Sequence, residues 1–136
     1  MLELSQAALT TAGIAVLAAV TVTSGGYFMT RVVTGAVPAT PFQTSFFRAG
    51  HAHAGMFITL GLVCLLLTET TDLAGGWAWL ARTGVLVAAI LMPAGFFLSA
   101  IGTGRERPSR LVVLLYLGAA FLVAGLLTLR VGLLTA

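Results

Sequence analysis

The chain has 136 residues, of which 59% are hydrophobic and 8% are charged, and its mean hydropathy is +1.06. Soluble domains carry about 25% charged residues, so this composition excludes a soluble globular protein and predicts that lipid surrounds most of the chain. The seven basic residues, all arginine, and the four acidic residues give a formal charge of +3. These charges lie between apolar runs, a pattern typical of membrane topology signals, and no nucleic-acid partner is expected.

Four apolar runs are long enough to cross a bilayer, because a hydrocarbon core of about 30 Å needs about 20 helical residues. They cover approximately residues 7–28, 48–68, 77–101 and 111–134. Glu3 and the absence of a basic residue before the first run favour a spanning helix over a cleaved signal peptide. Backbone polar groups in lipid must be paired within their own segment, so every run is predicted to be helical.

The connections between the runs are short, and neither a second domain nor an internal repeat is evident. The predicted fold class is therefore all-α: residues 1–136 form a single domain, an integral membrane four-helix bundle with antiparallel neighbours. Glycine and alanine recur in all four runs, which favours close helix packing. Pro93 in the third run predicts a kink. Cys64 is the only cysteine, so an intrachain disulfide is excluded.

Arginine is concentrated at one end of the predicted bundle. That end holds Arg31, Arg48, Arg105, Arg107 and Arg110, whereas the other end holds Arg82 and Arg130 together with Glu3, Glu69 and Asp72. The positive-inside rule then predicts that both termini lie outside the cell membrane. An anion bound by some of these arginines would weaken that prediction.

The second run begins in the stretch FFRAGHAHAGMFITLGLVCLLL, which carries the only two histidines of the chain. Ionisable residues inside a membrane are candidates for function, and this criterion selects Arg48, His51 and His53. Arg82 and Arg130 lie near helix ends, where their long side chains are expected to reach the interface. The alternative for each histidine is an interfacial side chain that merely bonds a carbonyl or a headgroup.

Helical geometry separates the two histidines. On a regular helix they lie about 200° apart, so His51 and His53 face different sides and cannot chelate one metal ion. If residues 49–53 were extended instead, both imidazoles would share one face. They would then bind copper or zinc, with Met56 as a soft third ligand.

Small residues flank both histidines and leave room for a large flat group such as haem. An imidazole would ligate the iron, and Arg48 would neutralise the propionates. The 15-residue stretch FRAGHAHAGMFITLG resembles the second transmembrane helix of the catalytic subunit of the haem–copper oxidase superfamily, which includes nitric oxide reductases. The step Arg48-Ala-Gly-His51 is similar to that family's Arg-x-x-His start, which implies that His51 ligates a low-spin haem. The segment Ala52–Met56 resembles the Ala-His-Gly-x-x-Met pattern of the family's aa3-type branch. That resemblance implies His53, rather than His51, as the haem ligand.

The chain departs from that family in important respects. It has no histidine beyond His51 and His53, so one chain lacks the second axial ligand, the copper ligands and the active-site haem ligand. No catalytic residues are predicted, and reduction of oxygen or nitric oxide by a single chain is not expected. The family's ligand histidine also lies near the outer face, whereas the arginine bias places this one near the cytoplasm.

The family's large subunit resembles three four-helix arcs in a pseudo-threefold ring, which implies that this chain forms a homotrimer. The predicted function is binding of haem or a transition metal for electron transfer, sensing or cofactor handling. Two alternatives are an oligomeric channel or transporter with a histidine-lined constriction, and a non-catalytic structural or assembly subunit of a larger membrane complex.

Overall fold

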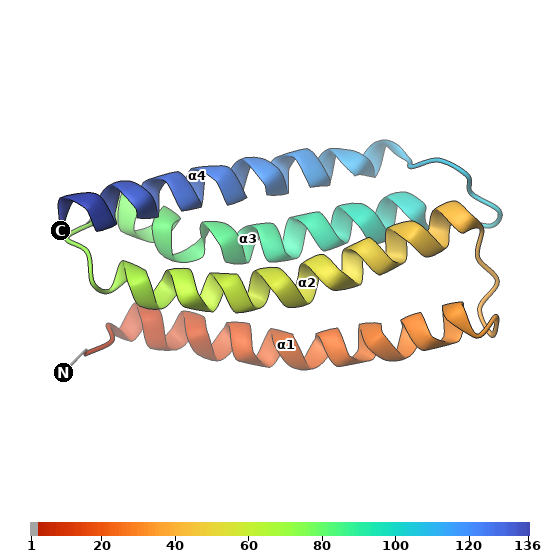
Figure 1. Cartoon of the computed structure of the whole chain (residues 1–136), viewed down its shortest axis with the longest axis horizontal. Helices are drawn as coiled ribbons and strands as arrows, with labels where there is room; N and C mark the ends of the chain where they lie inside the picture. Colours follow the sequence, from red (N-terminus) through yellow and green to blue (C-terminus); the bar gives the residue numbers. More distant parts are fainter. Residues whose placement is uncertain (1–2) are drawn as a thin grey trace.

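The computed structural model describes residues 3–136, which form four long α-helices and one short 3₁₀ helix (Figure 1). These are α1 (Gln6–Val33), α2 (Pro41–Thr68), α3 (Gly75–Ala100), η1 (Arg110–Val112) and α4 (Val113–Thr135). All four long helices are long and apolar enough to cross a membrane. The predicted all-α four-helix bundle is therefore confirmed, and its four long helices are compatible with a multi-pass membrane protein. Residues 1 and 2 of the predicted domain lie outside the described residues.

The predicted start of the second helix is wrong. α2 begins at Pro41 rather than at Arg48, because Thr40 and Gln43 form a capping box and Pro41 occupies the first helical position. The connection to α1 consequently spans only residues 34–40. At a rise of 1.5 Å per residue, His51 lies about 15 Å along α2 from Pro41, so it is inside the helix and not at its mouth.

The start of α2 is fixed by contacts with α3 and α1. The buried side chain of Gln43 donates through Nε2 to the carbonyls of Ala100 (2.8 Å) and Gly102 (2.7 Å). These bonds satisfy acceptors that the end of α3 leaves unpaired. One turn of α2 later, the Phe47 ring packs edge-on against Phe28 of α1. Polar and aromatic contacts together hold the first turns of α2 in place.

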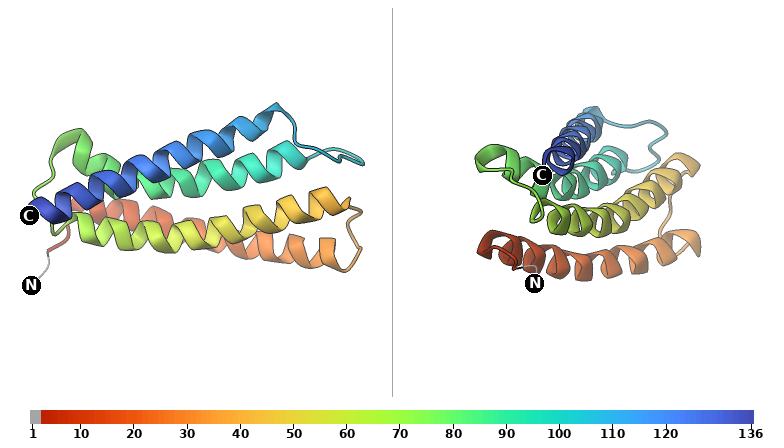
Figure 2. Two further views of the ribbon diagram at one scale, coloured as in Figure 1. Left: turned by 45° about the horizontal axis from the view of Figure 1, so that its top comes forward. Right: turned by 60° about the vertical axis from the view of Figure 1, so that its left-hand side comes forward.

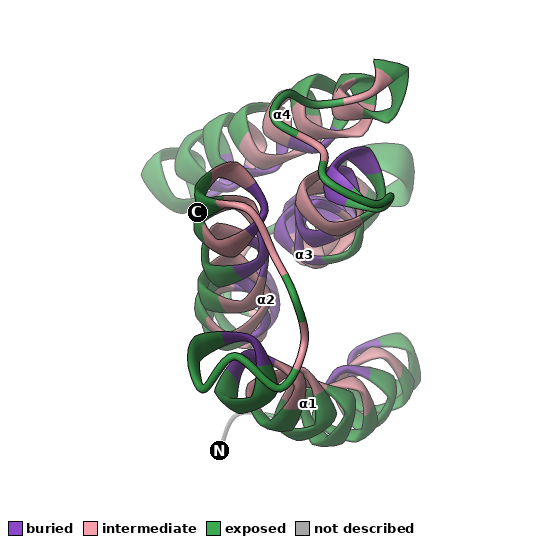
Figure 3. Ribbon diagram, turned by 90° about the vertical axis from the view of Figure 1, so that its right-hand side faces the viewer, coloured by how far each residue is buried: buried purple, intermediate pink, exposed green. Residues whose placement is uncertain are grey.

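The helices follow one another across the molecule in chain order (Figures 1 and 2). α3 packs extensively against both α2 and α4, whereas α1 lies against α2 and barely touches α3. Seen end-on, the buried surface is concentrated on the facing sides of α2 and α3, and the outer sides of α1 and α4 are exposed (Figure 3). The four helices thus form an open, curved layer, and their exposed apolar sides are suited to lipid.

Glycine allows close contact between α3 and α4. A Cβ atom built on Gly84 of α3 would lie 2.8 Å from the Cα of Gly125 in α4, and one built on Gly125 would lie 3.0 Å from the Cα of Gly84. Backbones approach this closely only where side chains are absent, as is common between helices in lipid. Gly84 and Gly125 therefore allow the close approach of α3 and α4 at this point.

Exposed aromatic residues lie near both ends of the spans. Trp77 and Trp79 are exposed at the start of α3, and Tyr27 and Tyr116 are exposed near the opposite end of the molecule. Tyrosine and tryptophan favour the two membrane–water interfaces. The start of α1 and the end of α4 both lie at the tryptophan end (Figure 1), as an even number of antiparallel helices requires.

Candidate functional site

Both histidines lie within the regular part of α2, so residues 49–53 do not adopt the extended conformation that would bring their side chains to one face. His51 lies against α1, and His53 packs against α3. The structure thus agrees with the helical interpretation, in which each imidazole has its own neighbours. Arg48 is about 60° from His51 around the helix and about 140° from His53, so it shares a side with His51.

The His53 ring is fixed by a backbone hydrogen bond. Its Nδ1 lies 2.7 Å from the carbonyl oxygen of Ala49, one turn earlier in α2. A carbonyl oxygen only accepts hydrogen bonds, so Nδ1 is the donor, and the tautomer of a neutral ring that fits this contact has its lone pair on Nε2. Histidines that bind metals in proteins commonly have this arrangement, in which one nitrogen donates to a carbonyl and the other ligates.

Aromatic rings enclose the half-buried His53 imidazole. Its centroid lies 5.0 Å from that of Phe96 in α3 and 5.3 Å from that of Phe57 in α2. Met56, the predicted soft ligand, follows His53 by three residues and is exposed on the outside of the helix layer. The immediate environment of His53 is therefore aromatic and apolar.

The His51 ring lies against a glycine pair in α1. A Cβ atom built on Gly25 would lie 3.1 Å from Nδ1 of His51, and one built on Gly26 would lie 3.6 Å from Nε2. Any larger residue at position 25 would press on the imidazole. The glycine pair therefore makes the room that allows His51 to lie in the seam between α1 and α2.

His51 and Arg48 line a groove of about 400 Å³ with the last turns of α1. The α1 residues in its wall are Met29, Thr30, Val33 and Thr34. The Arg48 side chain is exposed, and no carboxylate among residues 3–136 lies within ion-pair distance of it. The structure thus brings together two of the predicted site residues, Arg48 and His51, and places His53 elsewhere.

Side chains of the metal-ligating types do not cluster. Among the residues that the structure describes, no group of three or more histidine, cysteine, aspartate or glutamate side chains is placed to hold a metal ion. Cys64 is buried in α2, eleven residues beyond His53. A protein site that supplies three or four ligands to one ion is therefore absent from this part of the chain.

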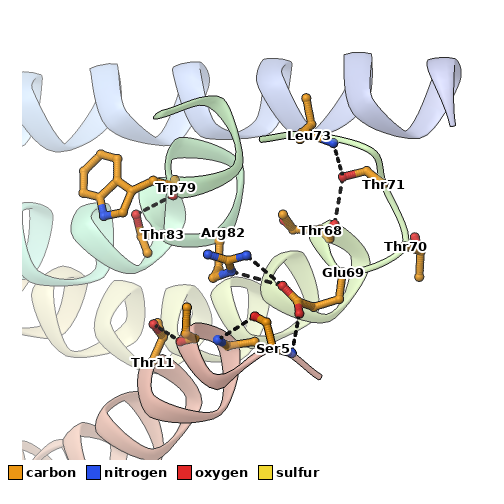
Figure 4. A network of polar contacts seen from close by, with 12 residues as sticks. Ser5, Thr11, Thr68, Glu69, Thr70, Thr71, Leu73, Trp79, Arg82 and Thr83 are labelled. Atoms are coloured by element: carbon orange, nitrogen blue, oxygen red, sulfur yellow. Dashed lines mark hydrogen bonds and ion pairs between the residues drawn. The ribbon is translucent and has the colours of Figure 1, made fainter. Parts of the chain in front are cut away.

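The opposite end of the molecule holds a polar cluster that the sequence did not reveal (Figure 4). The Arg82 guanidinium donates to Glu69 Oε1 from Nη2 (2.8 Å) and from Nε (3.2 Å). The backbone N–H of Ser5 donates to Glu69 Oε2 (2.7 Å). The sequence placed Arg82 near a helix end but did not indicate its partner, Glu69 at the end of α2.

This cluster affects the ionisation of Glu69, which lies just beyond the end of α2. Burial alone would raise the pKa of its carboxyl, but the Ser5 N–H, the Arg82 hydrogen bonds and the Arg82 charge outweigh burial and lower the pKa below its ordinary value. Glu69 is therefore ionised near neutral pH. Through its contacts with Ser5 and Arg82, the Glu69 carboxylate connects the start of α1 and the third turn of α3 to the end of α2.

No protein-family model, curated protein or solved structure matches this chain. The assignment of a function therefore depends on the geometry of Arg48, His51 and His53. The resemblance of residues 47–61 to a haem–copper oxidase helix stays a prediction.

Proposed function

We propose that this protein is a small integral membrane haem protein in which Nε2 of His53 ligates the iron. The observation that carries the proposal is the 2.7 Å contact between His53 Nδ1 and the Ala49 carbonyl, which leaves the Nε2 lone pair free. The rings of Phe57 and Phe96 supply an apolar surface beside it. Bound haem would supply one-electron chemistry, so the role would be electron transfer, sensing or cofactor handling.

The ligand types of the chain favour haem over a bare metal ion. Zinc in proteins takes three or four protein ligands, and copper sites likewise combine several histidine, cysteine or methionine side chains. The described residues offer no group of three histidine, cysteine or acidic side chains. Haem brings four equatorial nitrogens of its own, so a single imidazole suffices to attach it. Copper or zinc bound through His51, His53 and Met56 is therefore the weaker proposal.

If the iron took a second histidine from protein, that residue would come from another molecule. The other histidine of the chain, His51, lies against α1 and on a different side of α2 from His53. We propose that the chain forms a homo-oligomer, with a trimer as the arrangement that the resemblance to the pseudo-threefold ring of haem–copper oxidases implies. Native mass spectrometry in detergent tests this part by itself, and a purely monomeric protein would exclude the oligomer without affecting ligation by His53.

The test of haem binding is a visible absorption spectrum of the protein purified in detergent from cells supplied with a haem precursor. We expect a Soret band in the wild type and in His51→Ala, and its loss in His53→Ala. His53→Met, which can still ligate iron, is expected to retain haem with a shifted spectrum. A wild type without a Soret band, or a His53→Ala variant with an unchanged one, would contradict the proposal.

A further inference from the structure

We propose that the groove between the end of α1 and the first half of α2 binds the phosphate headgroup of an anionic lipid, with Arg48 as its principal partner. This site is separate from the proposed haem ligand, because Arg48 lies about 140° from His53 around α2. Lipid binding at Arg48 is therefore independent of whether His53 binds haem.

The groove lies at the depth of a lipid headgroup and the first carbons of its chains. Thr34 in its wall is the C-cap of α1, and Arg48 lies about 10 Å along α2 from Pro41. An arginine at that depth extends toward the interface along the helix surface. Met29 and Val33 form an apolar wall on the α1 side, which suits an acyl chain next to a charged group.

The hydrogen-bond donors in the groove favour an anion. The hydroxyls of Thr30 and Thr34 donate to the carbonyls of Gly26 (3.1 Å) and Thr30 (2.9 Å) within α1, so their protons are already used. The donors that remain are the Arg48 guanidinium and the His51 ring. A guanidinium matches two phosphate oxygens at once, and the Gly25–Gly26 pair leaves room for the imidazole beside it.

The surrounding charge also favours an anionic headgroup. The end of the molecule that contains the groove carries Arg31, Arg48, Arg105, Arg107 and Arg110 against a single acid, Glu106. The ion pair found among residues 3–136, between Arg82 and Glu69, lies at the opposite end. Arginine close to a membrane surface attracts anionic lipids, and Arg48 lines an interhelical groove with an apolar wall.

The experiment is a native mass spectrometry titration of the haem-free protein with phosphatidylglycerol, using phosphatidylcholine as the uncharged reference. We expect preferential retention of phosphatidylglycerol, and an apparent dissociation constant raised about fivefold in Arg48→Ala. Arg107→Ala is the matched control, because Arg107 is exposed at the same end but outside the groove. Equal losses in both variants, or no preference for phosphatidylglycerol, would overturn the proposal.

A second variant tests the groove without changing any charge. Thr30 is exposed on α1 and lines the groove, so Thr30→Phe fills the cavity while every arginine remains. It should weaken phosphatidylglycerol binding as Arg48→Ala does, and unchanged binding would overturn the assignment to the groove. Inorganic phosphate added in excess should leave the bound lipid in place, whereas its displacement would show a free-anion site instead.

Discussion

Glu69 and Arg82 form an ion pair of 2.8 Å in which both side chains are largely buried, with exposed fractions of 6% and 16%. The pair joins the end of α2 to the third turn of α3, and Ser5 brings the start of α1 to the same carboxylate. Removing one partner of a buried pair leaves the other charge without compensation. The cluster is thus a specific tertiary contact at the end where both termini lie.

Arg82→Met is expected to lower the free energy of unfolding in detergent by about 3 kcal/mol, because it leaves the Glu69 carboxylate buried without its cation. Circular dichroism during thermal unfolding measures the change. The double variant Glu69→Gln with Arg82→Met is the control, since removing both charges together costs less than removing one. A double variant less stable than the single one would show that the charges themselves do not determine this contact.

The same pair predicts a dependence of stability on pH. The pKa of Glu69 is lower in the folded protein than its ordinary value of about 4.3. Its contribution to stability is therefore fully present above about pH 4.3 and is lost as the pH falls through the folded pKa. Thermal unfolding of wild type and Glu69→Gln across this range should show a wild-type advantage at neutral pH that disappears in acid. A constant difference between the two proteins would contradict the assignment.

The sequence predicts the helices well and their ends less well. Apolar runs located all four spans, but the first turns of α2 contain Gln43, Thr44 and Ser45, so a hydropathy window begins too late. The signal that was available is local: Thr40, Pro41 and Gln43 form a recognisable helix start. The 200° separation of His51 and His53 followed directly from helix geometry.

The contacts between different helices could not be predicted from the sequence in the same way. Glu69 and Arg82 are thirteen residues apart, across a turn whose geometry decides whether they meet. The contact of His51 with Gly25 and Gly26 likewise depends on the register between α1 and α2. Neither relationship has a periodic signal within one helix, so a single sequence does not reveal them.

Alanine is expected to change the stability of the protein in opposite directions at two glycines, Gly84 in the α3–α4 contact and Gly13 on the open side of α1. Gly84→Ala is expected to destabilise the protein by about 1–3 kcal/mol, since its Cβ would lie 2.8 Å from the Gly125 backbone. Gly13→Ala is the control, because no atom outside its own helix lies within 4 Å of the added Cβ. There alanine should stabilise α1 by about 0.5–1 kcal/mol. Thermal unfolding of both variants checks the pair, and equal effects would contradict the close contact.

The structure shows which arginines at each end of the bundle are paired, and this bears on the predicted orientation of the chain in the membrane. Arg82 is neutralised by Glu69, which leaves Arg130 as the unpaired arginine at the terminal end among the described residues. The other end keeps Arg31, Arg105, Arg107 and Arg110 even if Arg48 holds an anion. The positive-inside rule therefore still predicts that both termini lie outside.

The orientation can be tested by cysteine labelling. In a Cys64→Ser background, Thr135→Cys should react with a membrane-impermeant maleimide on intact cells. Glu106→Cys, in the connection before α4, should react only after the membrane is opened. The reverse pattern would place the Arg48 groove on the outer face.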